Sequence, residues 1–351
     1  MTRKTPSTLY LLCLAFPLLF PSCASTGAGT AKNNPPNWVR DPYTEYNRQT
    51  TVVEVGGGSS REAAEKSAFG KLVAFFGQSI QVDEKVSVSY QQAFRNGVTA
   101  NWSENTTVDS MISTSASLNS LVGAEIGDRW DDGKEFFAVA VLNKANAIRI
   151  YPDIIKSNLT MIDNLINIPP AERNTLEGYA RYQFAATVAD MTIQYANLLS
   201  FIGGPKQAVK RGDDYRLEAL GIVKAIPVTI NVQNDMAGRI EGAFAKALSN
   251  LGFQIGGNNS RYTLDVNIIT TAVEYPNDEK KWTLINVAAN LVDSGSGAVL
   301  LPYNFPTPRA GHNTQALADN LAYRDAEDKI NAEYAGLLSG YLNQLLPKIQ
   351  P

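Results

Sequence analysis

The sequence contains few residues of the kinds that build metal centres and catalytic triads. It has 1 histidine and 2 cysteines among 351 residues. A zinc site with several imidazole ligands is therefore excluded, and a Ser-His-Asp triad could use only His312. Cys13 and Cys23 both lie close to the amino terminus, so a disulfide framework across the folded part is excluded as well.

Two further features are missing: an excess of positive charge and a long apolar run near the amino terminus. The formal net charge is −3 and becomes about −5 once Arg3 and Lys4 are removed, which disfavours nucleic acid and polybasic membrane contacts as functions. The apolar run over residues 9–20 is 12 residues long. It is short of the ~20 residues that a membrane-spanning helix needs.

What the amino terminus does contain is typical of a bacterial lipoprotein precursor. Arg3 and Lys4 give a basic start, the apolar run follows, and the small residue Ser22 precedes Cys23. We expect the mature chain to begin at a lipidated (palmitoylated) Cys23, anchored in the outer membrane and facing the periplasm.

The sequence before the predicted cleavage point departs from the common lipoprotein pattern. Phe20, Pro21 and Ser22 stand where that pattern has Leu, a small residue and Gly or Ala. The alternative is an ordinary secretory signal peptide cleaved at Ala24 or Ser25, which would leave a soluble periplasmic or secreted protein.

Composition shifts and breaker residues divide the chain further, and we predict an α+β protein of two small mixed domains bridged by a long helical hairpin. The predicted segments are a signal peptide (1–22), a flexible tether (23–37), a first α+β domain (38–143), a helical hairpin (144–204), a linker (205–225) and a second α+β domain (226–346).

In the first domain, alternation predicts a strand over residues 51–55, and Gly56-Gly57-Gly58 then predicts a turn into a helix over 59–76. Ser59 and Glu62 have the spacing of a capping box at its start. A further long strand is predicted over 80–88. Residues 118–130 and 135–142 predict two strands joined by an Asp-Gly hairpin turn.

The middle of the chain has the periodicity of helices. Residues 143–168 predict one helix, with Pro152 expected near its start, and Pro169-Pro170 end it. Asn174 is expected to cap a second helix that runs to about residue 199, and the exposed basic connector 206–216 follows.

The second domain again begins with a strand and a helix. We predict a strand from Ile226, a helix capped by Asp235 and ended by Gly252, and strands over 262–271, 282–293 and 298–303. A closing helix is predicted over 314–345. Its expected apolar face consists of Leu317, Leu321, Ile330, Tyr334, Leu338 and Leu345.

Two parts of the chain resemble known families. Residues 36–39, then 53–60, and the hairpin sequences around 130–133 and 136–140 resemble the LPP-twenty family of bacterial outer-membrane lipoproteins. Residues 226–345 more loosely resemble the amino-terminal domain of TolB and modules of the CsgG and FlgT group. These resemblances imply envelope assembly or support with protein partners, often as rings, and transfer no catalytic residues.

Three short motifs could carry chemistry. Gly56, Gly57 and Gly58 between a strand and a helix have the right context for a phosphate, but the remaining residues of a dinucleotide or P-loop fingerprint are missing, which favours a tight turn. Residues 128–133 lack the ligands that a calcium loop needs at its third and twelfth positions, which favours a hairpin turn. His312 is interpreted as a surface residue before a helix.

Other candidate residues are scattered. The acids Glu54, Asp265 and Glu274 could serve a glycosidase only if two of them converged across a cleft. Residues 211–213 match an adhesion tripeptide that also arises by chance. The aromatic residues that could stack on sugars, or simply pack in a core, include Trp38, Trp102 and Trp282.

The sequence therefore predicts a lipid-anchored, non-catalytic envelope protein that needs no metal and no cofactor. It is expected to act through envelope protein partners or as a homo-oligomer. The alternative is a ligand-binding module for peptidoglycan or another glycan, which would use a groove between the two domains.

Overall fold

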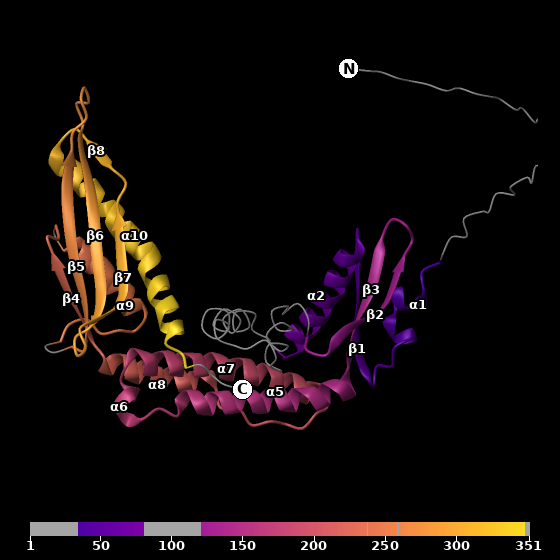
Figure 1. The fold of residues 1–351 in the computed structure, drawn as a ribbon. Helices are drawn as coiled ribbons and strands as arrows, with labels where there is room; N and C mark the ends of the chain where they lie inside the picture. Colours follow the sequence, from indigo (N-terminus) through magenta and orange to yellow (C-terminus); the bar gives the residue numbers. More distant parts are fainter. Residues whose placement is uncertain (1–33, 81–120, 237, 258–259, 348–351) are drawn as a thin grey trace, which may run out of the picture. The chain divides into compact units, whose positions relative to one another are not determined.

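Two β-sheets and a set of long helices make up the computed structural model of the chain, which is an α+β protein (Figure 1). The structure describes residues 34–80, 121–236, 238–257 and 260–347. No helix in these ranges is both long enough and apolar enough to cross a membrane.

The first sheet has three antiparallel strands in the order β1-β3-β2: β1 (Thr51–Gly58), β2 (Ala124–Asp131) and β3 (Phe136–Asn143). Helix α2 (Arg61–Ile80) packs against β1 and β3. On the other side, Trp38 of the short helix α1 (Asn37–Arg40) is 3% exposed and packs with Val53, Val139 and Val141. A single 3-10 turn, η1 (Pro42–Thr44), follows α1.

The three glycines predicted to form a turn lie inside β1 instead. A Cβ atom on Gly56 would stand 2.0 Å from the backbone N of Ala68, and one on Gly58 would stand 2.7 Å from Cβ of Ala63. Glycine is required here because α2 approaches β1 this closely. The helix is then capped by Ser60 rather than Ser59, since the Ser60 hydroxyl accepts from Ala63 N.

Other expectations for the first domain need correction. Ile80, predicted to begin a strand, is the last residue of α2, and the rest of that predicted strand lies outside the described residues. The first strand of the predicted hairpin, β2, begins at Ala124 rather than at residue 118. The hairpin turn itself is confirmed, with Gly133 at φ 84°.

Long helices follow the first sheet. They are α5 (Lys144–Ile166), the short α6 (Pro170–Arg173), α7 (Leu176–Phe201) and α8 (Gly212–Ala225). Helix α7 packs against both α5 and α8.

Three details of the helical region differ from the prediction. Pro152 lies in the interior of α5 rather than near its start, and Thr175 rather than Asn174 caps α7, because its hydroxyl accepts from Gly178 N at 3.0 Å. The prediction of an exposed connector over residues 206–216 is wrong from residue 212 onward, where helix α8 begins. Tyr215 of α8 is 6% exposed and belongs to the core against α7, because the polar start of this helix is followed by an apolar stripe.

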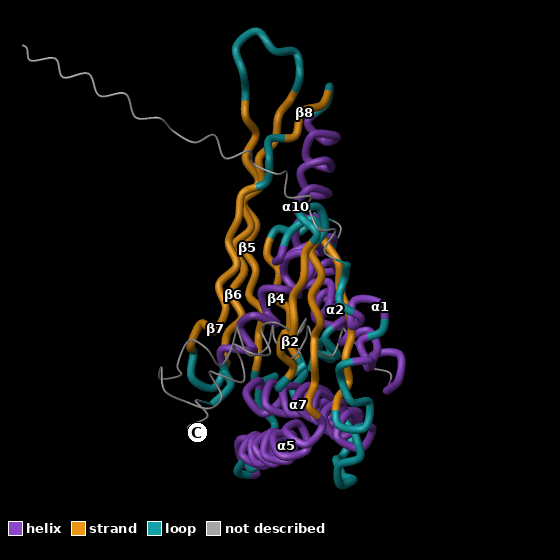
Figure 2. The backbone as a smooth tube through the Cα atoms, turned by 90° about the vertical axis from the view of Figure 1, so that its right-hand side faces the viewer, coloured by secondary structure: helices purple, strands orange, loops and turns teal. Residues whose placement is uncertain are grey.

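The second sheet has the order β4-β5-β6-β7: β4 (Val228–Gln233), β5 (Tyr262–Val273), β6 (Lys281–Asp293) and β7 (Ala298–Pro306). Strand β4 runs parallel to β5, the other neighbours are antiparallel, and β8 (Ala310–His312) pairs with the start of β6. Figure 2 shows β5 and β6 as the long hairpin of this sheet.

Two helices, α9 (Arg239–Asn250) and α10 (Gln315–Gln344), pack with one another and with this sheet. The N-cap residue of α9 is Gly238 rather than the predicted Asp235, although the Asp235 carboxylate does accept from Ile240 N and Glu241 N in the first turn. Gly252 follows the end of α9 at φ 91°, as predicted. Leu317, expected on the apolar face of α10, is 45% exposed. That face is formed mainly by alanines and by Tyr323, Ile330, Tyr334 and Leu338.

Candidate functional site

The predicted lipidation site, Cys23, lies outside the described residues, and so does Trp102. Among the residues that the structure describes, no group of three His, Cys, Asp or Glu side chains could hold a metal ion. His312 lies on β8, where it pairs with Lys281 of β6. It does not cap the helix that follows, because the N-cap of α10 is Thr314.

The motif candidates have structural roles. At the glycines considered for phosphate binding, the amide of Ala63 in the first turn of α2 already donates to the Ser60 hydroxyl. Ala63 also packs closely against Gly58 of β1. In the segment considered as a calcium loop, Asp132 Oδ1 accepts from Lys134 N and Glu135 N at 2.8 Å each, so this carboxylate organises a turn.

The scattered acids do not form a pair across a cleft. Glu54 lies on the first sheet, where burial raises the pKa of its carboxyl group. Asp265 and Glu274 lie in and just after β5, nine positions and therefore ~30 Å apart along an extended chain. A pair of catalytic carboxyl groups needs a separation of about 5 to 9.5 Å.

The adhesion-like tripeptide begins α8 and is tied to its neighbours. Arg211 pairs with Asp213 at 3.1 Å, and Gly212 N donates to Asp190 Oδ1 of α7 at 3.1 Å. Of the aromatic candidates, Trp38 is buried and Trp282 is half-buried on β6.

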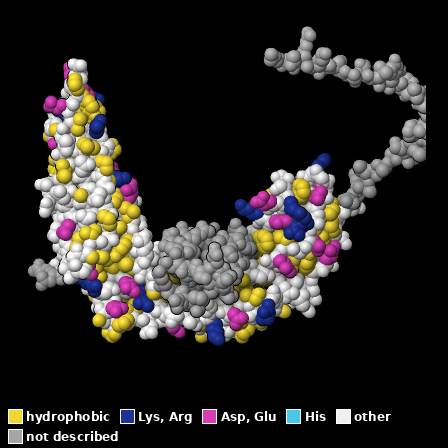
Figure 3. Space-filling model, viewed as in Figure 1, with side chains coloured by type: hydrophobic (Ala, Val, Ile, Leu, Met, Phe, Trp, Pro, Cys, Tyr) yellow, Lys and Arg dark blue, Asp and Glu magenta, His cyan; other side chains and the backbone are white. Residues whose placement is uncertain are grey.

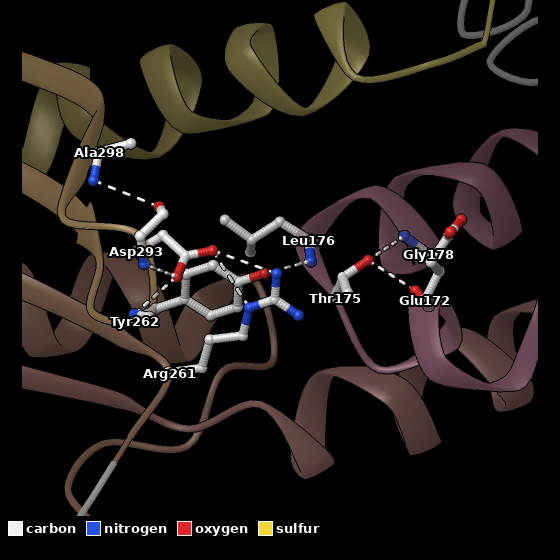
Figure 4. Close-up of polar contacts among 10 residues, drawn as sticks. Glu172, Thr175, Leu176, Gly178, Arg261, Tyr262, Asp293 and Ala298 are labelled. Atoms are coloured by element: carbon white, nitrogen blue, oxygen red, sulfur yellow. Dashed lines mark hydrogen bonds and ion pairs between the residues drawn. The ribbon is translucent and has the colours of Figure 1, made fainter.

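A cluster of polar contacts joins the start of α7 to the second sheet (Figure 4). Leu176 N, in the first turn of α7, donates to the hydroxyl of Tyr262 at 3.2 Å. Arg261 pairs with Asp293 at 3.1 Å, and Asp293 Oδ1 also accepts from Gly295 N at 2.9 Å. Tyr262 satisfies an amide at the start of α7, and Asp293 stabilises the turn between β6 and β7, so the cluster has a structural role.

The electrostatics of this cluster agree with that reading. Burial disfavours ionisation of Asp293, but the hydrogen bonds from Gly295 N and Arg261 outweigh it and hold the pKa of the carboxyl group below its ordinary value. Burial raises the pKa of the Tyr262 hydroxyl. Asp293 is therefore a charged hydrogen-bond acceptor and Tyr262 a neutral donor and acceptor at neutral pH.

The strongest candidate for binding is a groove of about 650 Å³ between strand β7 and helix α10, here called the β7–α10 groove. Its lining is mostly apolar and comes from Leu300, Leu301 and Pro302 of β7 and from Glu333, Gly336, Leu337, Gly340, Tyr341 and Gln344 of α10. Leu337 is 43% exposed. A Cβ atom on Gly336 or Gly340 would meet nothing within 4 Å, so the two glycines leave open space.

Charge contributes little to this groove. Glu333 is the one ionisable carboxylate in the lining, and it accepts from Lys329 Nζ at 2.7 Å and from the Tyr303 hydroxyl at 3.1 Å. Burial raises the pKa of Tyr341, so this side chain stays neutral. Over the face shown in Figure 3, Lys and Arg side chains are dispersed among acidic and apolar ones.

The groove could not be found from sequence, because its two walls are distant along the chain. The only local signal is the spacing of Gly336 and Gly340 in an otherwise helical segment, where glycine lowers helix propensity.

A second cavity of about 420 Å³ lies among α7, the end of α9 and the end of α10, and no residue of the first domain lines it. Gln183, Thr187, Asn250, Ser339 and Asn343 give it an uncharged polar lining. Its two aromatic residues, Tyr179 and Phe184, are 6% and 3% exposed. They offer no open ring face on which a sugar could stack.

No protein-family model and no curated protein matches the sequence. Among solved structures, a secreted protein of Helicobacter pylori is 13% identical, covers 82% of this chain and 97% of its own, and has a TM-score of 0.43. A minor lipoprotein of Acinetobacter baumannii is 13% identical, covers 32% and 92%, and has a TM-score of 0.27. Scores of this size establish no shared fold.

Proposed function

We propose that the protein is a non-catalytic lipoprotein of the bacterial envelope that binds a helix of an envelope protein partner in the β7–α10 groove. The observation that carries the proposal is the apolar lining of the groove together with the open space at Gly336 and Gly340. The amino-terminal sequence supports a lipid anchor at Cys23 in the outer membrane, with the folded part in the periplasm.

The geometry favours a helix over a strand as the occupant. An added strand would pair with the free edge of β7, but Pro302 and Pro306 in this edge strand have no N–H group to donate. A helix needs no backbone donors from its partner, because its own hydrogen bonds are internal. The glycines of α10 let the axis of such a helix come close, and Leu337 and Tyr341 provide apolar contacts.

The groove is tested by filling it. Gly336→Leu places a side chain in the open space, and it should also stabilise α10 by up to ~1 kcal/mol because leucine is the better helix former. A photo-crosslinker at Leu337, introduced into the full-length protein in intact cells, should capture a protein partner, and Gly336→Leu should abolish that capture.

Gly242→Leu is the matched control, because Gly242 lies in α9 and also faces open space. It should leave the capture unchanged. Capture that persists in Gly336→Leu would overturn the groove as the binding site. A crosslinked product of twice the mass of this chain would overturn the proposal that the partner is another envelope protein. A second copy of the same chain would then supply the helix.

The anchor is tested separately by metabolic labelling with palmitate. The wild-type protein should incorporate the label and fractionate with the outer membrane, whereas Cys23→Ala should incorporate none. Equal labelling of the two proteins would contradict lipidation at Cys23.

A further inference from the structure

One face of the second sheet is left open by the two helices. Side chains alternate along the strands, and those facing α9 and α10 are buried, for example Leu264 on β5, Val287 on β6 and Phe305 on β7. Their neighbours in sequence point to the opposite side and are exposed or half-buried. This second side is called the open face below.

The open face is rich in carboxamide side chains. Strand pairing places them in neighbouring rows. Asn231, Asp265 and Asn290 follow one another across β4, β5 and β6, and Gln233 lies beside Asn267. Asn304 is two positions from Pro306, which faces Asn286. The six amides are Asn231, Gln233, Asn267, Asn286, Asn290 and Asn304, and all but the half-buried Asn290 are exposed.

Charge is almost missing from the open face. Along the four strands its outward positions hold one carboxylate, Asp265, and no lysine or arginine, while Arg261 and Lys281 lie at the strand ends. Asp265 is already engaged, because its Oδ1 accepts from Asn231 Nδ2 at 2.9 Å. The side chains of Asn267, Asn286 and Asn304 make no hydrogen bond to any residue that the structure describes, so they are available to a ligand.

An aromatic pair stands at one end of the open face. Trp282 of β6 is paired with Gly311 of β8, and a Cβ atom on Gly311 would lie 2.7 Å from the indole ring, so the ring occupies the place of the missing side chain. Tyr275 meets Trp282 edge to face, with 5.7 Å between ring centroids, and is 36% exposed. Trp282 Nε1 donates to Asp278 Oδ2 at 2.8 Å, which fixes the ring.

These features match the chemistry of a neutral glycan. Each carboxamide has two donors and an acceptor, and a sugar hydroxyl also donates and accepts, so an amide array can bind a chain of hydroxyl and N-acetyl groups without any charge. An indole ring provides an apolar surface for the C–H face of a sugar. The strands extend the array over ~27 Å from Asn290 to Trp282, longer than one sugar ring.

We propose that the open face of the second sheet binds an uncharged glycan chain, with Trp282 as the stacking platform and Asn267, Asn286 and Asn304 as the hydrogen-bonding groups. Nucleic acid fits poorly, because the outward positions of the four strands hold no lysine or arginine, and the cation at the aromatic end, Arg309, already contacts the ring and hydroxyl of Tyr275. A protein partner fits less well. The central hot spots of protein interfaces are rich in Trp, Tyr and Arg, and the middle of this face has Ile269 as its large apolar residue.

The test measures binding of the full-length protein in detergent to chitohexaose, a neutral chain of N-acetylglucosamine, by calorimetry. We expect saturable binding. The double variant Asn267→Ala/Asn286→Ala should weaken it about tenfold or more, since each lost hydrogen bond is worth ~1 kcal/mol. Trp282→Ala should weaken it similarly through the loss of stacking.

Asn331→Ala is the matched control, because Asn331 is an exposed asparagine on α10, away from the open face. It should bind like the wild type. The proposal is overturned if the wild type does not bind, or if all variants bind equally. Circular dichroism spectra of the variants must match the wild type. A Trp282→Phe variant, which keeps an aromatic ring, should retain more binding than Trp282→Ala and separates stacking from misfolding.

This outcome is independent of the β7–α10 groove. Gly336→Leu should leave glycan binding unchanged, and Asn267→Ala/Asn286→Ala should leave partner capture at Leu337 unchanged. If glycan binding fails and capture succeeds, the open face is not a glycan site and the proposed protein interaction stands.

Discussion

At the scale of single residues, Gly56 sets the distance between β1 and α2. Gly56→Ala would push a methyl group into the backbone of Ala68, 2.0 Å away, and we expect a loss of ~3 kcal/mol in the free energy of unfolding, the upper end of the usual cost of overpacking. Gly70→Ala, on the exposed side of the same helix with nothing within 4 Å, should instead gain up to ~1 kcal/mol. Urea unfolding distinguishes them, and similar values for the two variants would contradict the close approach.

Asp293 gives the fold a dependence on pH. Its pKa is lower in the folded state than in the unfolded state, so its contribution is fully present above the unfolded pKa of about 4 and is lost as the pH falls through the folded value. The wild type should therefore be more stable than Asp293→Asn at pH 7.

That difference should shrink when the pH falls below about 4. Thermal unfolding of the two proteins between pH 7 and pH 2.5 measures it. A difference that stays constant over this range would show that the charge of Asp293 contributes nothing.

At the scale of elements, strand β7 is an edge that its sequence protects. Replacing Pro302 and Pro306 by valine would restore two N–H groups and raise strand propensity. We expect the double variant to self-associate through this edge, as seen by a concentration-dependent rise in sedimentation coefficient.

Asn304→Val is the control for that experiment. Asn304 lies between the two prolines on the same strand, so the substitution adds an apolar β-former without adding a backbone donor. If Asn304→Val associated as strongly as the double proline variant, surface hydrophobicity rather than the free edge would be the cause.

The elements with clear alternation could be predicted from sequence. The strand expected over residues 262–271 is β5, Tyr262–Val273, and the one expected over 282–293 is β6, Lys281–Asp293. Gly252 was identified as the end of α9 because a left-handed residue after an apolar stripe is a strong local signal.

The features that the sequence did not predict have a common cause. Each depends on contacts between segments that are distant along the chain. Gly56 to Gly58 have the composition of a turn, and only the approach of α2 explains them in a strand. Helix α8 starts with a polar segment, and its apolar side is recognisable once α7 is there to cover it. The β7–α10 groove depends on the packing of a helix against a strand, and the open face depends on strand pairing. No short motif encodes either contact.

At the scale of the whole molecule, one apolar core continues from α7 and α8 into the second sheet and α10. Ile222 of α8 is 2% exposed within it. Because a continuous core unfolds cooperatively, Ile222→Ala should cost ~2 to 5 kcal/mol and should lower hydrogen-exchange protection in β5 and β6 as well as in α8.

Leu72→Ala is the comparison, since Leu72 is fully buried in the core beneath the first sheet. It should lower protection in α2 and β3 while leaving β5 and β6 protected. Loss of protection confined to α8 in the Ile222 variant would mean that the helices unfold apart from the second sheet.

The hydrogen bond from Leu176 N to the Tyr262 hydroxyl bears on how the chain acquires its structure. The acceptor lies 86 residues after the donor, so during synthesis or export the first turn of α7 emerges long before the side chain that completes it. Until β5 has formed, this amide can bond only to water. The first turn of α7 therefore becomes complete in the nascent protein only when a residue of the second sheet is in place.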